Sequence, residues 1–200
     1  MKKQTLALFD FDCTITTHDT FLPFLLYSSG KLKGILKLTL LTPYFIGFVL
    51  KVQTRQQVKE RVLKSFFAGE PIDRIRQLGR TYAESMMPKS VKPEALKRIE
   101  WHKSRGDRIV IVSASLDVYL QPWTHSVGIE ELICTHLETD STGKVTGKIA
   151  GINCWGKEKV RQLEKRIPNM QEMTIFAYGD SRGDRELLEI ADHPFYREMP

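Results

Sequence analysis

Residues 6–14 read LALFDFDCT, an apolar run that leads directly into two aspartates, Asp10 and Asp12. Side chains alternate along a strand with a period of two, so a strand that persisted through this stretch would point both carboxylates to one spot. Two converging like charges are tolerated when one carboxyl is protonated or when a cation lies between them. Both conditions are typical of functional sites. A turn after a strand is the alternative for this stretch taken alone.

The composition is that of an ordinary folded protein, with 42% apolar and 27% charged residues among 200. This length predicts one domain with an insertion or two small domains. The net charge of +6 favours anionic partners. The basic residues are scattered without a nucleic-acid-binding motif, so we expect no nucleic-acid partner. Three cysteines without CxxC spacing favour reduced thiols and a cytoplasmic location.

The order of elements predicts an α/β fold. Helical patterns fill residues 18–105, and apolar runs typical of buried parallel strands follow at 108–115 and 173–181. A helical pattern with a proline behind it separates these two runs. We therefore expect a Rossmann-like parallel sheet flanked by helices, built from residues 1–17 and 106–200, with residues 18–105 inserted after the first strand as a helical cap.

Two segments of the chain lie outside this regular alternation. Residues 133–151 predict two extended pieces around a turn at 141–143, and a last short strand is expected near 194–196. The most apolar stretch, residues 35–50, is shorter than the roughly 20 residues that span a bilayer. We expect it to form a buried or half-buried helix pair, with contact to the inner face of the membrane as the alternative.

Polar side chains follow the expected strands at the points where they end. Asp10 and Asp12 follow the first strand, Ser113 the second, and Asp180 with Asp184 a later one. Ligands of open parallel sheets bind beyond the carboxyl ends of the strands, so these residues are expected to meet there. Four carboxylates at one edge need a hard cation, and Mg2+ suits them.

This set of groups favours phosphoryl transfer. One aspartate carboxylate can attack phosphorus and form an aspartyl-phosphate. A second carboxyl then protonates the leaving alkoxide and later deprotonates the incoming water. Mg2+, hydroxyl donors and a lysine such as Lys159 stabilise the charge that grows on the phosphoryl oxygens.

Four motifs, FDFDCTIT, VSAS, GKEK and GDSRGD, resemble in this order those of the haloacid dehalogenase superfamily. The chain looks most like the phosphatases of its subgroup IB, which include phosphoserine phosphatases and bacterial phosphatidylglycerophosphate phosphatases. The resemblance covers essentially the whole chain. It implies Asp10 as the nucleophile and Asp12 as the acid/base. It also implies Mg2+ at Asp10, Asp180 and the main-chain carbonyl of Asp12, with Asp184 and Ser181 in support.

The same resemblance assigns the residues that hold the transferring phosphoryl group. These are Thr14, Ser113 and Lys159, and Lys157 is a less suitable rival because GxxK is the spacing of the family. One departure is Cys13, where glycine or serine is more usual. The second aspartate of the first motif favours hydrolysis of phosphomonoesters over displacement of halide.

The substrate is expected to be a small phosphorylated metabolite that the cap selects. Asp19 stands where phosphoserine phosphatases have a glutamate, which makes it the candidate specificity residue. The lysine-flanked apolar segment at 30–51 favours the alternative of a lipid phosphate hydrolysed at a membrane surface. A catalytically silent phosphate-binding protein is the alternative of another class, although every catalytic position is filled. The sequence makes no prediction of oligomeric state.

Overall fold

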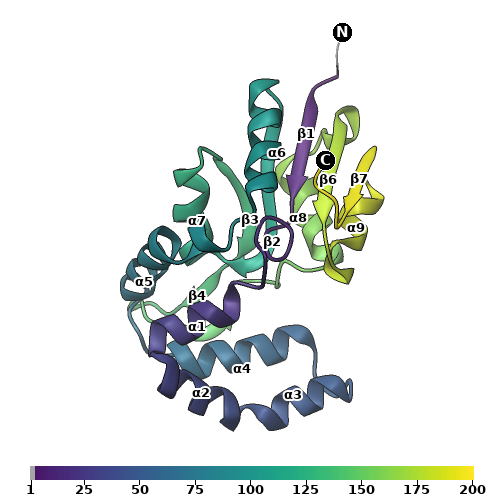
Figure 1. The fold of residues 1–200 in the computed structure, drawn as a ribbon. Helices are drawn as coiled ribbons and strands as arrows, with labels where there is room; N and C mark the ends of the chain where they lie inside the picture. Colours follow the sequence, from purple (N-terminus) through teal and green to yellow (C-terminus); the bar gives the residue numbers. More distant parts are fainter. Residues whose placement is uncertain (1–2) are drawn as a thin grey trace.

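The computed structural model describes residues 3–200, and its centre is a parallel sheet of five strands in the order β3-β2-β1-β6-β7 (Figure 1). The strands are β1 (Thr5–Phe9), β2 (Arg108–Leu116), β3 (Glu131–Thr135), β6 (Thr174–Gly179) and β7 (His193–Tyr196). The central strand β1 is buried along its whole length. Its continuous apolar run is what a parallel strand covered on both faces requires.

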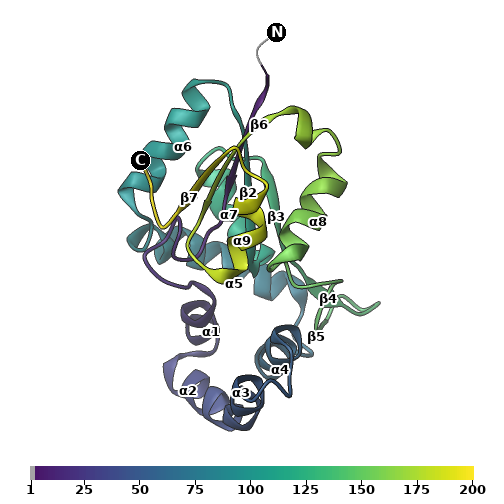
Figure 2. The same cartoon turned by 90° about the vertical axis from the view of Figure 1, so that its right-hand side faces the viewer.

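Helices cover both faces of the sheet (Figure 2). They are α6 (Pro93–Ser104) and α7 (Asp117–Ser126) on one face, and α8 (Lys157–Arg166) and α9 (Arg185–Glu189) on the other. Side chains of β1 alternate between these layers. Ala7 and Phe9 pack with α6 and α7, whereas Leu6 and Leu8 pack with α8 and α9. The predicted α/β architecture is confirmed by this arrangement.

The segment between β1 and α6 is helical. It contains α1 (Phe21–Ser29), α2 (Lys31–Leu40), α3 (Thr42–Val49), α4 (Arg55–Phe67), α5 (Ile72–Ser85) and the 3-10 turn η1 (Met87–Lys89). The first four helices lie beyond the carboxyl end of the sheet, while α5 packs against α7 (Figure 1). A helical block in this position closes over the strand ends.

The chain leaves and re-enters the α/β layers through two segments that pair side by side. Thr16 forms a β-bridge with Val91, and the main-chain N–H of Lys92 donates to the carbonyl of Ile15 at 2.8 Å. The helix α6 that follows packs against β2. We therefore propose that the cap ends near residue 90, so that α6, which we predicted as part of the cap, belongs to the core.

A small antiparallel hairpin supports the cap from the other side. It consists of β4 (Leu137–Thr139) and β5 (Val145–Ile149), on either side of the predicted turn at 141–143. Strand β5 packs against α4 so closely that a Cβ atom on Gly147 would lie 2.5 Å from the Cα of Lys64. The remaining short elements are the 3-10 turns η2 (Met170–Glu172) and η3 (Arg182–Asp184).

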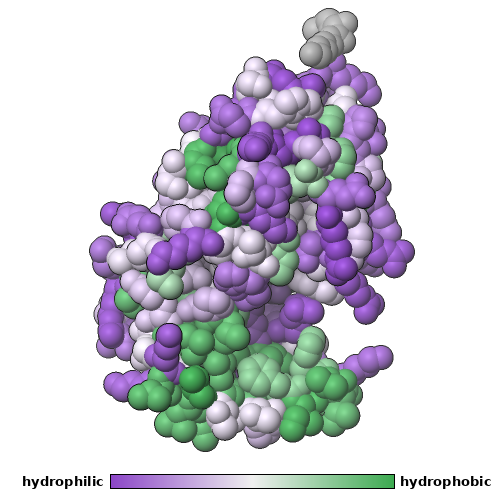
Figure 3. Space-filling view, in the orientation of Figure 1, coloured by the Kyte–Doolittle hydropathy of each residue, from purple (hydrophilic) through white to green (hydrophobic). Residues whose placement is uncertain are grey.

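The most apolar stretch forms the expected helix pair, α2 and α3, and the pair is half-buried: Leu38, Leu41 and Phe45 pack against the core, whereas the outer side is exposed. Leu32 is 87% exposed, Leu40 69% and Val49 77%. These helices are the layer farthest from the sheet, so their outer side has no protein partner among residues 3–200 (Figure 3). No single helix of residues 3–200 has the length and apolarity to cross a membrane, and α2 with α3 passes that test only as a pair bent by 52°.

The contact between α5 and α7 yields a test of the packing. A Cβ atom on Gly79 of α5 would lie 2.1 Å from the carbonyl oxygen of Val118. Gly79→Ala therefore forces the helices apart, and we expect a loss of about 1–3 kcal/mol in the free energy of unfolding. Denaturant titration measures this loss. The control is Arg80→Ala, a change at the neighbouring exposed residue. An equal loss of unfolding free energy in this variant would contradict the close contact.

Candidate active site

Asp10 directly follows β1 and is held there by both main chain and side chain. Its main-chain N–H donates to the carbonyl of Tyr178 in β6 at 2.9 Å. Its carboxylate accepts hydrogen bonds from Lys159 Nζ at 2.5 Å and from Thr14 Oγ1 at 3.1 Å. Burial raises the pKa of Asp10 to about 7, and the charge of Lys159 opposes this rise. The predicted nucleophile is thus a buried carboxylate beside an ammonium group.

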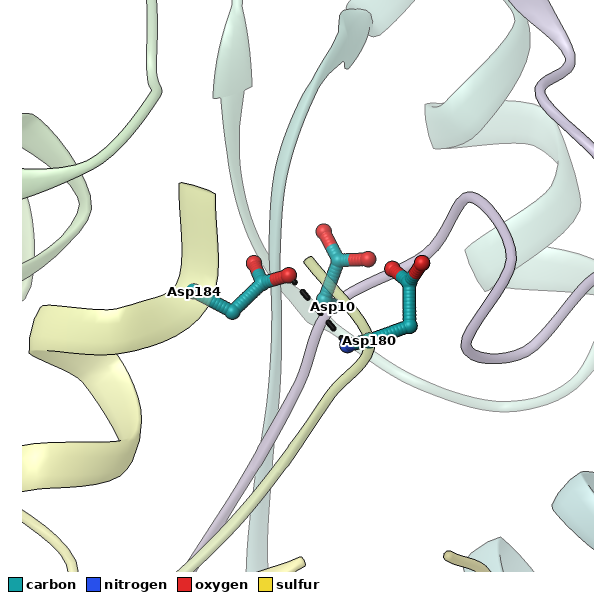
Figure 4. A group of neighbouring side chains, drawn as sticks. All are labelled: Asp10, Asp180 and Asp184. Carbon is teal, nitrogen blue, oxygen red and sulfur yellow. Dashed lines mark hydrogen bonds between the residues drawn. The ribbon is translucent and has the colours of Figure 1, made fainter. Parts of the chain in front are cut away.

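Three carboxylates gather at this edge of the sheet, from Asp10, Asp180 and Asp184 (Figure 4). One oxygen of each lies within 4.8 Å of the others. Lys159 Nζ also donates to Asp184 at 2.6 Å, so a single ammonium group serves two of the three acids. A cluster of carboxylate oxygens is the donor set that Mg2+ prefers, and the residues present therefore fit this ion.

Asp184 is fixed by the turn that follows β6. Its Oδ2 accepts hydrogen bonds from the N–H and hydroxyl of Ser181 at 3.0 and 2.8 Å, and from the N–H of Asp180. Burial alone would raise the pKa of Asp184, but Lys159 and Ser181 hold it below its usual value. Gly179 leaves room for this arrangement, because a Cβ atom there would lie 2.5 Å from that of Asp184.

Asp12 lies apart from the three-carboxylate cluster, so the expectation that both aspartates point to one spot is wrong. Strand β1 ends at Phe9, and its alternation of side chains does not continue to Asp12. The carboxylate of Asp12 accepts hydrogen bonds from the N–H and hydroxyl of Thr20 at 2.7 and 2.6 Å, and from the hydroxyl of Ser115. Burial raises its pKa above the usual value, which favours the protonated acid.

Two of the three expected phosphate-binding residues, Thr14 and Lys159, donate hydrogen bonds to Asp10. Thr14 Oγ1 lies 3.4 Å from Asp180 as well as close to Asp10. Ser113 is buried in β2, the neighbour of β1, where its hydroxyl accepts from the N–H of Ser115 at 3.0 Å. Lys159 is buried on α8, whereas its rival Lys157 is exposed.

A cavity of about 290 Å3 opens beside Asp12, under the cap. Its walls combine apolar side chains of the cap with polar groups of the core. Its lining comprises Asp12, Asp19, Phe21, Phe45, Phe48, Arg55, Val58, Lys59, Val62, Ala114, Ser115, Asn153 and Trp155. Asp19 is exposed, and its carboxylate also caps α1 by accepting from the N–H of Phe21 at 3.0 Å.

Two basic residues of α4 in this cavity were missed by the sequence analysis. Lys59 Nζ donates to the carbonyl of Ala114 and to Asn153 Oδ1, and burial lowers the pKa of Lys59 to about 8. The guanidinium of Arg55 lies 4.5 Å from the ring centre of Trp155, and no carboxylate among residues 3–200 forms an ion pair with it. The sequence offered one indication of this pair, because Arg55 and Lys59 lie four residues apart and therefore on the same side of an amphipathic helix.

Two other missed residues, Thr20 and Ser115, hold Asp12. Ser115 lies in the VSAS motif, two residues beyond the predicted Ser113, and Thr20 follows the candidate Asp19. Neither contact could be read from spacing, because both depend on how the chain turns after β1.

Known proteins are similar to this chain in sequence and in fold. Residues 7–189 match the family described as haloacid dehalogenase-like hydrolase. The chain belongs to this family. Protein CicA of Caulobacter vibrioides is 34% identical over 194 residues, which cover 96% of this chain and 85% of that protein. The phosphoserine phosphatase of Methanocaldococcus jannaschii is 24% identical over 192 residues, which cover 95% of this chain and 83% of that enzyme.

Among solved structures, a protein with unknown function from Bordetella pertussis Tohama I is similar, with a TM-score of 0.79. It is 22% identical, and the match covers 94% of this chain and 87% of that one. This likeness concerns the fold alone. Together with the family match, it confirms the predicted fold class, the predicted superfamily and a hydrolase of the phosphatase type.

The separation of Asp12 from the three-carboxylate cluster yields a test of the metal site. Asp180→Asn should weaken Mg2+ binding about tenfold or more, since even indirect partners of a metal have effects of this size. Asp12→Asn should leave the affinity nearly unchanged, because its carboxylate faces Thr20 and Ser115. Calorimetric titration with Mg2+ measures both, without substrate. Equal affinities in the two variants would contradict the assignment of the site.

Proposed function

We propose that this protein is an Mg2+-dependent phosphomonoester hydrolase that acts through an aspartyl-phosphate on Asp10, with a small phosphorylated metabolite as substrate. The observation that carries this proposal is the division between the two aspartates. Asp10 lies with Lys159 in the three-carboxylate cluster, and Asp12 lines the cavity with a raised pKa. A nucleophile and a separate proton donor are what hydrolysis through a covalent intermediate requires.

In the first step an oxygen of Asp10 attacks phosphorus, and the bond between phosphorus and the leaving oxygen breaks. The electron pair of that bond moves to the leaving oxygen, which takes the proton of Asp12. Burial raises the pKa of Asp12, against the hydrogen bonds from Thr20 and Ser115 that lower it, and a raised pKa suits a carboxyl that donates a proton to the leaving group. Thr14, Ser113 and Lys159 hold the oxygens of the phosphoryl group during this transfer.

In the second step water attacks the same phosphorus atom and Asp12 takes its proton. The bond between phosphorus and Asp10 breaks, which releases phosphate and restores both side chains. Asp10, Asp180 and the main-chain carbonyl of Asp12 would hold Mg2+, with Asp184 and Ser181 in support. When bound, the ion offsets the negative charge on the phosphoryl oxygens.

The free thiols of Cys13, Cys134 and Cys154 support a location in the cytoplasm.

The residues that line the cavity indicate which chemical groups the leaving group carries. Lys59 and Arg55 supply positive charge beyond that of Lys159, and Phe21, Phe45 and Phe48 supply apolar contact. We infer a substrate whose leaving group carries a second anionic group next to an apolar part. Asp19 at the rim would accept a hydrogen bond from an amine or hydroxyl of that group.

A lipid phosphomonoester is the second candidate substrate. The observation in its favour is that Phe45 and Phe48, which line the cavity, belong to α3, a helix with an exposed apolar outer side. The similarity to subgroup IB, which includes enzymes for both kinds of ester, suits either substrate. A panel of soluble esters and of phosphatidylglycerophosphate in micelles, assayed for phosphate release with and without Mg2+, separates the two candidates.

Substitution of the two aspartates tests the roles proposed for them. Asp10→Asn should abolish turnover, because the amide is a poor nucleophile. Asp12→Asn should slow hydrolysis of alkyl phosphates by about 100- to 10,000-fold, and that of nitrophenyl phosphate far less, since nitrophenolate leaves without a proton. Steady-state rates across a series of leaving groups measure this difference. Equal losses across the series would exclude the acid role, and phosphate binding without turnover by the wild type would identify a silent protein.

The pKa of Lys59 predicts a pH dependence of substrate binding. Its lowered value of about 8 means that the ammonium form, present below this pH, is lost as the pH rises through 8. KM for a substrate with a second anion should therefore increase above pH 8. Lys59→Met should raise KM at pH 7 and remove this dependence, whereas Lys64→Met, an exposed change on the same helix, should not. An unaltered pH profile in Lys59→Met would show that Lys59 does not bind substrate.

A further inference from the structure

The outer side of α2 and α3, together with the turn that follows α3, carries a set of exposed apolar side chains, here named the α2–α3 face. Each is more than half exposed, and together they cover the end of the molecule opposite the amino terminus of β1 (Figure 3). Its members are Leu32, Ile35, Leu36, Leu40, Ile46, Val49, Leu50 and Val52. Scattered exposed apolar residues are normal, but a contiguous group of this kind marks an interaction site.

The segment of chain that forms this face carries charge of one sign. Residues 20–59 contain no aspartate or glutamate, although the chain as a whole has 24 acidic residues. The basic residues of the segment are Lys31, Lys33, Lys37, Lys51, Arg55 and Lys59. Lys31, Lys33 and Lys51 are exposed, next to members of the α2–α3 face. An apolar face bordered by cations matches a surface that is apolar beneath a layer of negative charge.

The dimensions of the helices favour a position along such a surface. Helix α2 has 10 residues and α3 has 8, so they are about 15 and 12 Å long at 1.5 Å per residue. Neither reaches across a hydrocarbon layer of about 30 Å. Both can lie at the interface with their apolar side chains inserted and their lysines among the headgroups.

We propose that the α2–α3 face docks on the surface of an anionic phospholipid bilayer. The docked helices place the cavity next to the headgroup layer, because α3 also contributes Phe45 and Phe48 to its wall. This inference does not depend on the chemistry proposed for Asp10, since it concerns only the outer side of the cap.

Co-sedimentation with vesicles tests the docking. The full chain should bind vesicles that contain phosphatidylglycerol and phosphatidylcholine, and bind pure phosphatidylcholine weakly. Leu36→Gln with Val49→Gln should lower the affinity for the anionic vesicles at least tenfold, since each change removes an aliphatic side chain from the apolar contact with the bilayer. Lys31→Glu with Lys33→Glu should lower it as well, and added salt should reduce this difference.

The control changes an exposed apolar residue elsewhere. Leu96→Gln on α6, at a site 40% exposed, should bind vesicles as the wild type does. Thermal melting shows whether each variant is folded, and hydrolysis of nitrophenyl phosphate in solution reports the active site independently of docking.

Two results would overturn the proposal. One is the absence of binding to anionic vesicles, or equal binding by the wild type and the Leu36→Gln, Val49→Gln variant. The other is a dimer, seen by sedimentation without lipid and lost in that variant, together with no vesicle binding. That result would assign the α2–α3 face to a second copy of the chain.

Discussion

The buried ammonium group of Lys159 is the contact on which the rest of the site depends. It joins Asp10 to Asp184, although 149 residues separate Lys159 from the first and 25 from the second. Unpaired buried charges are strongly unfavourable, so each of these groups requires the others. The sheet order brings them together, because β1 lies next to β6 and α8 packs on one face of these strands. The topology and the charge cluster therefore depend on each other.

The two aspartates of the first motif differ because the chain turns between them. After Phe9 the backbone leaves the strand, and Cys13 adopts a φ of 60°, in the left-handed region that favours glycine. This turn directs the carboxylate of Asp12 toward Thr20 and Ser115 and away from Lys159. Two chemically identical groups thereby acquire different hydrogen-bond partners, Lys159 and Thr14 for Asp10 and Thr20 and Ser115 for Asp12, although burial raises the pKa of both. Glycine, one of the two residues that the resemblance leads us to expect at the position of Cys13, adopts such a φ without steric cost.

The core was predictable from the sequence because its constraints are local. A strand buried on both faces needs a continuous apolar run, and parallel strands leave their polar ends at one edge, so the sequence alone groups Asp10, Ser113 and Asp180. The cap was less predictable because periodicity identifies an apolar side of a helix but not its partner. The exposure of Leu36 and the packing of α6 on the sheet are properties of the assembled chain. Lys59 was missed for the same reason.

Helix α3 connects the two surfaces that the cap presents. Phe45 and Phe48 face the cavity, whereas Ile46 and Val49 belong to the outer face, so one helix, about 10 Å across, separates substrate from the exterior. A contact made by the outer side of α3 therefore lies only one helix away from the wall of the cavity. Asp10, Asp180 and Asp184 lie beyond the ends of the sheet strands and not on α3, so a displacement of α3 would alter the cavity wall without moving the residues of the three-carboxylate cluster. In the proposed mechanism, the selection of substrate can therefore vary with the surroundings of the cap while the chemistry at Asp10 stays the same.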